Sequence, residues 1–163
     1  MAHEYSVGGG GITTVSAVVT LVFINPAAAP NVNLEILRCW AGQAVNATSA
    51  QQRVQLETQV TAFPTLTGVT PAKLKRAEAV SIIVSGAAGA AGTSGINASA
   101  EGAGAKTAII DEAFNVLNGY LWVPTPNETI VMPASSTSGF GLFFPVAPSV
   151  TTNWNFGVNF GER

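Results

Sequence analysis

Charged residues are scarce in this chain. Its 163 residues include only 7 Lys and Arg and 9 Asp and Glu, which together make 10% of the sequence, whereas about 25% is usual in soluble domains. A folded monomer of 16.7 kDa should expose roughly 7,600 Å², so these charges are thinly spread. Because 47% of the residues are hydrophobic and the mean hydropathy is +0.35, we expect copies of the chain or a partner to cover part of the surface.

Basic clusters and long apolar runs are also lacking. The net charge of −2 argues against nucleic acid as a partner, since phosphate binding needs a basic patch, and the one local cluster is Lys73, Lys75 and Arg76. The most apolar window, residues 12–29, is interrupted by polar residues and Pro26, so we expect no membrane span. The first residues lack the positive segment of a secretory signal, and we expect synthesis in a cytoplasm.

Side chains that perform catalysis are few. The chain has one histidine (His3), one cysteine (Cys39) and one aspartate (Asp111). One cysteine excludes an intrachain disulfide, and no spacing of His, Cys or carboxylates suits zinc. Adjacent residues on a strand point to opposite faces, so Asp111 and Glu112 cannot act as a carboxylate pair if they lie on a strand. We therefore expect no catalytic residue, no metal, no cofactor and no small-molecule substrate.

What the sequence does contain is a series of short β-strand patterns. Residues 53–63 alternate strictly, with Val54 and Leu56 predicted to face inward and Gln55, Glu57 and Gln59 outward. Other segments rich in β-branched or aromatic residues also predict strands. They are residues 12–25, 33–41, 120–123, 128–132, 139–144 and 152–160.

One segment is ambiguous. In residues 106–117 the apolar positions fit a helical face. The same residues also read as a strand, with Ile110, Glu112, Phe114 and Val116 on one side, although this alternation is less regular. We predict a strand because the surrounding segments are β, and the helix stays open as the alternative. The tight-turn pair Asn118-Gly119 follows it.

The spacing of strands and turns predicts an all-β fold with a single domain. About eight strands in a chain of this length favour a jelly-roll-like β-sandwich. Residues 1–11 end in four glycines and are expected to form a flexible N-terminal arm, so the sandwich would comprise residues 12–163. Residues 85–105 are almost entirely Gly, Ala, Ser and Thr, and we expect a long loop that lies against a neighbouring chain.

Four segments carry a resemblance to a known family. They are residues 1–11, 20–25, 119–126 and 154–162. In texture and architecture the chain resembles the trimeric cement (decoration) proteins on the heads of tailed bacteriophages. The resemblance implies a virion protein on the capsid exterior, a homotrimer that clamps neighbouring subunits of the major capsid protein. The candidate interface residues are Tyr5, Val7, Gly8, Gly9, Ile96, Trp122, Phe143, Trp154 and Phe156.

Three alternatives remain open at this point. A tail or head-fibre receptor-binding module would carry a shallow aromatic sugar site, for which Trp154 is the candidate. A jelly-roll capsid subunit of a small virus would need a basic internal arm, which the sequence lacks. A carbohydrate-active enzyme would need two carboxylates about 5 to 10 Å apart in one cleft.

Overall fold

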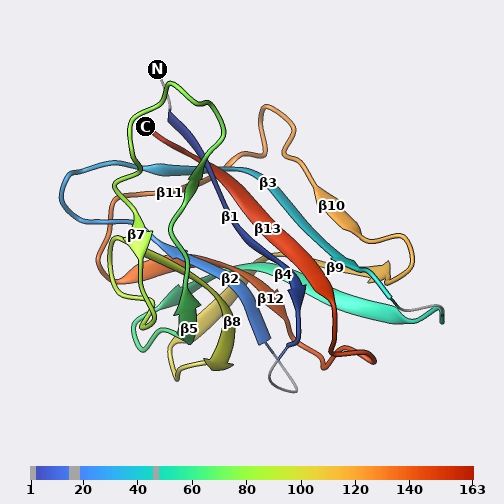
Figure 1. Ribbon diagram of the computed structural model, residues 1–163. Helices are drawn as coiled ribbons and strands as arrows, with labels where there is room; N and C mark the ends of the chain where they lie inside the picture. The colour runs from blue at the N-terminus through green and yellow to red at the C-terminus, as the bar shows by residue number, and fades with distance from the viewer. Residues whose placement is uncertain (1–2, 15–18, 46–47) are drawn as a thin grey trace.

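The alternating patterns form β-strands in the computed structural model, which describes residues 3–14, 19–45 and 48–163 (Figure 1). Strands occupy the predicted positions, and the described residues contain no helix. In chain order the strands are β1 His3–Ile12, β2 Val19–Asn25, β3 Leu34–Gln43, β4 Gln51–Val60, β5 Thr65–Gly68, β6 Ala72–Lys73, β7 Val84–Ser85, β8 Thr93–Ala100, β9 Ala105–Asn115, β10 Tyr120–Trp122, β11 Ile130–Met132, β12 Ser138–Phe144 and β13 Trp154–Glu162.

Two sheets pack face to face, and their strand order is that of a jelly roll. Sheet A contains β1, β13, β3 and β10 side by side, and sheet B contains β2, β12, β4 and β9. The first four strands, β1 to β4, alternate between sheet A and sheet B. The last strand, β13, lies beside the first, β1, as in a fold of two Greek keys. The prediction of an all-β, jelly-roll-like sandwich is confirmed. The structure adds five further strands, β5 to β8 and β11, to these eight.

Most of the added strands belong to an insertion between β4 and β9. Within it, β8 extends sheet B beyond β2, β5 pairs with β8, and β6 pairs with the first half of β1. The insertion therefore covers the side of the sandwich formed by β1 and β2. Figure 1 shows β5, β7 and β8 toward the left of the molecule and β10 at the right.

The core between the sheets is aromatic at its centre. The aromatic face of the last strand is buried, because Trp154, Phe156, Val158 and Phe160 all point inward from β13. The Trp154 ring meets that of Phe144 edge-on, with 5.0 Å between centroids. Such pairs stabilise beyond their buried area by about 0.5–1.5 kcal/mol.

The expected flexible arm is wrong for the part of residues 1–11 that the structure describes. Residues 3–11 lie in β1, which pairs with β13 along its length. The side chains of Tyr5 and Val7 are fully buried, and a Cβ on Gly8 would collide with the carbonyl oxygen of Phe156. The glycines therefore allow close backbone approach within a sheet rather than chain flexibility.

The expected loop at residues 85–105 is also wrong over much of its length, since β8 lies there between β2 and β5. Small residues suit this place because a Cβ on Gly95 would press against the side chain of Leu66 at 2.8 Å. For residues 106–117 the strand prediction is confirmed, as β9, and the helical alternative is wrong. Of the predicted strand at 12–25, residues 19–25 form β2, and residues 15–18 lie outside the described residues.

Candidate interaction surface

One side of the sandwich is left open by the topology. The strand β9 ends sheet B and β10 ends sheet A on the same side, and within the described residues neither has a strand neighbour on its outer edge. Figure 1 shows β10 and the C-terminal end of β9 at the right of the molecule. An unpaired edge presents a row of backbone N–H and C=O groups to any incoming strand.

Five of the eleven exposed large aliphatic side chains in the described residues lie on or beside this open side. Leu121 in the middle of β10 is 59% exposed, and Ile109 in the middle of β9 is 45% exposed. Further exposed aliphatic side chains lie in the β9–β10 turn, just after β10 and on β11, and they are Leu117, Val123 and Val131. Scattered apolar residues are normal on a surface, but a group on one side indicates a contact site.

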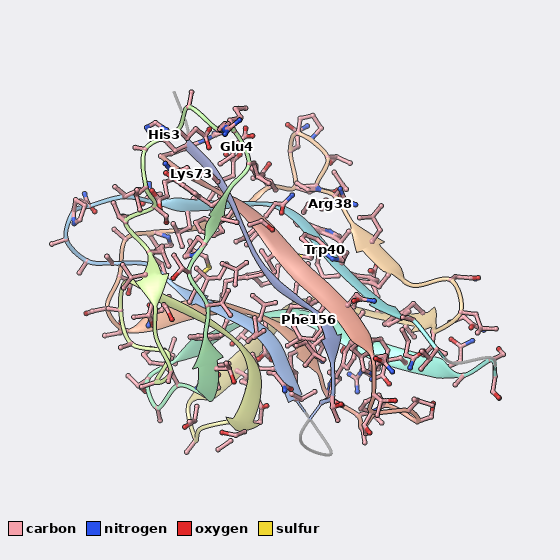
Figure 2. All side chains as sticks on the ribbon, viewed as in Figure 1. His3, Glu4, Arg38, Trp40, Lys73 and Phe156 are labelled. Atoms are coloured by element: carbon pink, nitrogen blue, oxygen red, sulfur yellow. The ribbon has the colours of Figure 1, made fainter. Side chains whose placement is uncertain are left out.

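The apolar surface extends from β10 across the outer face of sheet A. The register places Leu121, Trp40, Gly157 and Gly8 opposite one another across four strands, so they share one face. The indole of Trp40 covers Gly157, because a Cβ at that position would overlap the ring. The guanidinium carbon of Arg38 lies 5.5 Å from the ring centroid, within the range of a cation–π contact. Figure 2 shows Arg38 and Trp40 along β3, with Phe156 on β13.

A groove of about 330 Å³ lies between Trp40 and the segment that crosses from β5 to β6. Its floor is the backbone of β1 near Gly8, and its other wall includes Thr70 and Ala72. None of the described residues that line it is charged, and the hydroxyl groups among them belong to Ser6 and Thr70. This lining suits a neutral ligand with hydroxyl or amide groups and a face that can stack on an indole.

A buried charge cluster occupies the outer face of sheet B. The Lys106 ammonium lies 3.0 Å from Glu57 Oε1, 2.7 Å from Glu101 Oε2 and 3.4 Å from the centre of the Phe143 ring. Glu101 also accepts hydrogen bonds from the backbone N–H and the hydroxyl of Thr20, at 2.7 and 2.6 Å. Glu57 is only 1% exposed, and its burial raises the pKa of the carboxyl to about 7 although Lys106 acts against the shift.

The candidate catalytic side chains do not converge. The Cys39 thiol is fully buried, and burial raises its pKa well above the usual value. Asp111 accepts hydrogen bonds from Arg53 and Gln55, which lower the pKa of its carboxyl to about 2. Its neighbour Glu112 pairs with Val54 and lies on the opposite face of the sheet, as strand geometry requires.

Neither a metal-binding cluster nor a membrane-spanning helix occurs in the part of the chain that the structure describes. Within residues 3–14, 19–45 and 48–163, no three His, Cys, Asp or Glu side chains are grouped closely enough to hold a metal ion. In this part of the chain there is no helix that is long and apolar enough to cross a bilayer.

The structure places most predicted interface residues inside the sandwich. Five belong to the core and cannot contact a partner without unfolding, namely Tyr5, Val7, Ile96, Trp154 and Phe156. Phe143 is buried under Lys106 on the outer face of sheet B. Gly8 and Gly9 are half-buried beside the groove, and Trp122 is half-buried on β10. These nine residues are not brought together into one surface.

Trp154 is not the predicted sugar platform. Its ring is fully buried, and its Nε1–H donates a hydrogen bond of 2.8 Å to the carbonyl oxygen of Val150. The tryptophan that faces outward is Trp40, which lies in the strand predicted at residues 33–41. The signal that could have identified it is Arg38, two residues earlier and therefore on the same face of the strand.

Comparisons with known proteins identify no relative. No protein-family model, no curated protein and no solved structure matches the chain.

Proposed function

We propose that this protein is a structural, non-enzymatic component that acts by attaching to other protein chains, and that it decorates the outside of a bacteriophage capsid. The observation that carries the proposal is the open side of the jelly roll, where two unpaired strand edges and exposed aliphatic side chains occur together. The capsid as partner comes from the resemblance to cement proteins, and the geometry supports the more general part, binding to protein.

The composition of the surface supports attachment. The folded chain exposes 7,308 Å² and carries 16 charged residues. Several of these charged side chains form ion pairs within the chain, such as Lys106 with Glu57 and Arg53 with Asp111. A thinly charged surface loses little hydration when it is covered, so apolar contact and backbone pairing can hold it to a partner.

Decoration would stabilise a capsid through many modest contacts. Each copy that bridges two capsid subunits adds buried area, and separating the subunits then requires all these contacts to break together. The major capsid protein would be the partner, and the protein would reside on the virion exterior. The function requires neither a catalytic group nor a cofactor.

The test is cosedimentation with capsids assembled from the major capsid protein encoded in the same genome. We expect the wild-type protein to sediment with the shells and Leu121→Lys to bind at least tenfold more weakly, because a charge would be buried in an apolar contact. The matched control is Val80→Lys, which adds the same charge at an exposed position in the β6–β7 connection. Equal binding by Leu121→Lys and the wild type would refute the assigned surface, and absence of wild-type binding would refute decoration.

A second candidate function is binding of a neutral glycan, as in a tail or head-fibre receptor-binding module. The groove beside Trp40 favours it, since an indole wall, two hydroxyls and an uncharged lining suit a sugar ring. A glycan array followed by calorimetry tests it. We expect Leu121→Lys to keep the glycan binding of the wild type and Trp40→Ala to lose it. An array on which the wild type binds no glycan would reject this function.

A further inference from the structure

The charge cluster around Lys106 crosses the outer face of sheet B. Thr20 lies on β2, Phe143 on β12, Glu57 on β4 and Lys106 on β9, which are neighbouring strands, and Glu101 directly follows β8. The Lys106 nitrogen lies between two carboxylates, 2.7 Å from Glu101 Oε2 and 3.0 Å from Glu57 Oε1. All three side chains are mostly buried. An amine and two carboxyl groups are thus in contact with one another and largely shielded from bulk water.

The two carboxyls have different surroundings, and each environment suits a different chemical role. Thr20 donates two hydrogen bonds to Glu101, from its backbone N–H to Oε1 at 2.7 Å and from its hydroxyl to Oε2 at 2.6 Å. Donors in this position stabilise the negative charge that develops on an oxygen when the carboxyl carbon is attacked. Among the described residues Glu57 has no partner other than Lys106. Its pKa of about 7 allows this carboxyl to take up and release a proton near neutral pH.

The contact between Lys106 and Glu101 also favours a reaction between them. It holds the nitrogen beside the carboxyl carbon, so the two groups meet as in an intramolecular reaction. The Phe143 ring covers the ammonium, with 3.4 Å from the nitrogen to the ring centre. Burying an ammonium and a carboxylate costs desolvation energy that a neutral amide in the same place avoids. The surroundings therefore favour an amide and a released water molecule over the two buried charges.

We propose that Lys106 Nζ and Glu101 Cδ form an isopeptide (side-chain amide) bond in the folded protein, with Glu57 as the group that carries the protons. Glu57 Oε1 takes one proton from the ammonium, and the resulting amine attacks Cδ of Glu101. Charge builds on Glu101 Oε1, which the Thr20 N–H stabilises. Glu57 passes this proton and then a second one from the nitrogen to Glu101 Oε2, which leaves as water. One ammonium and one carboxylate thereby give one amide and one water, and no oxidant or cofactor takes part.

The bond would hold the outer face of sheet B together. Glu101 is hydrogen-bonded to Thr20 on β2, whereas Lys106 belongs to β9, the strand at the open end of the sheet. An amide between them would lie over Phe143 on β12, between these two strands. It would oppose separation of β9 from the sheet. Each chain reacts once, so the inference goes beyond attachment to a partner without making the protein an enzyme, and the carboxyl of Glu57 stays free in the product.

The deciding measurement is the intact mass of the purified protein in denaturing solvent, where ion pairs dissociate and an amide survives. After incubation at about pH 7 we expect the wild type to be lighter than its sequence mass by one water. Trypsin locates the bond, because it does not cleave after an acylated lysine. The digest should contain residues 77–163 as one peptide that is lighter by one water, in place of the separate peptides 77–106 and 107–163.

Two conservative variants assign the roles. Lys106→Arg keeps a cation but has no amine that forms this bond, so its mass should equal its own sequence mass. Glu57→Gln keeps the shape of the side chain but cannot carry the proton, and the bonded fraction at equal times after cell-free synthesis should fall at least about tenfold. Lys75 is the control within the wild type. It lies 3.2 Å from a carboxylate oxygen of Glu4 but is 61% exposed, and trypsin should cleave after it.

A wild-type mass without the loss of water after prolonged incubation would overturn the proposal. A bond from Lys106 to Glu57 would also overturn it, and would appear as peptide 54–73 joined to peptide 77–163. Loss of water in Lys106→Arg, or bonding of Glu57→Gln at the wild-type rate, would contradict the assigned roles. None of these measurements involves a capsid, so a free Lys106 would leave the proposed function standing.

Discussion

Glu57 makes the stability of this protein depend on pH in an unusual direction. Its carboxyl is 1% exposed on the outer face of sheet B, and Lys106 is the cation beside it at 3.0 Å. Among the residues that the structure describes, none donates a hydrogen bond to either carboxylate oxygen apart from this ion pair. Burial raises the pKa from 4.5 to about 7, so the folded state holds a proton that the unfolded chain has already released.

The sign and size of the effect follow from this difference. In the window between pH 4.5 and 7 the folded state binds more protons than the unfolded state, so the free energy of unfolding falls as pH rises. One pKa unit corresponds to about 1.4 kcal/mol, so the full loss is about 3 kcal/mol. For a domain of this size that amounts to a decrease in Tm of about 6–12 °C.

The perturbation is Glu57→Gln, which keeps the shape of the side chain and removes its ionisation. We expect the wild type to lose stability between pH 4.5 and 7.5 in thermal unfolding followed by circular dichroism, and Glu57→Gln to lose at least 2 kcal/mol less, by the same pKa arithmetic (roughly). Lys106 keeps its contact with Glu101 in the variant. Glu128→Gln, at an exposed site, is the matched control and should follow the wild type. Parallel pH curves for the wild type and Glu57→Gln would refute the reasoning.

Three further predictions concern the packing of sheet A. Gly157→Ala should destabilise the protein by about 1–3 kcal/mol in urea unfolding, because its methyl group would overlap the Trp40 ring. Gly42→Ala is the control and should cost less than about 1 kcal/mol, because the space around the added carbon is open. Equal losses of stability in the two variants would contradict this packing. Cys39 should react with a thiol reagent only after unfolding, and rapid labelling of the native protein would contradict its burial. Trp154→Ala should cost about 3–5 kcal/mol in the same assay, and a loss below 1 kcal/mol would place this ring outside the core.

The correct sequence predictions share a physical basis. Alternation of apolar and polar residues reports which side of a strand is buried, and this signal is strong in residues 53–63 and 152–160. Val54 and Leu56 are buried as predicted. Pro and Asn-Gly signals bounded several of the strands, and about eight strands of this kind suffice to favour a jelly roll.

The wrong predictions also share a basis. Glycine and alanine carry almost no hydrophobic signal, so β1 and β8 read as an arm and a loop although both are paired on two sides over part of their length. Backbone hydrogen bonds and close approach hold these strands, and neither depends on side-chain pattern. Five of the nine assigned interface residues lie in the core, because large apolar side chains are used for the core as readily as for contacts.

The scarcity of charge predicts assembly with other chains, and this remains a prediction. The fold adds a candidate contact site, which is the open side formed by β9 and β10.

The sequence by itself determined the strands that alternate, the all-β class and the poverty of charge, because these are properties of local pattern and composition. Only the tertiary structure decided that Trp40 faces outward while Trp154 lies in the core, and that Glu57 is buried on a face predicted to be exposed. Only it showed which strand edges stay open. Each of these depends on which segments become neighbours, and neighbours far apart in the sequence leave no trace in a local pattern.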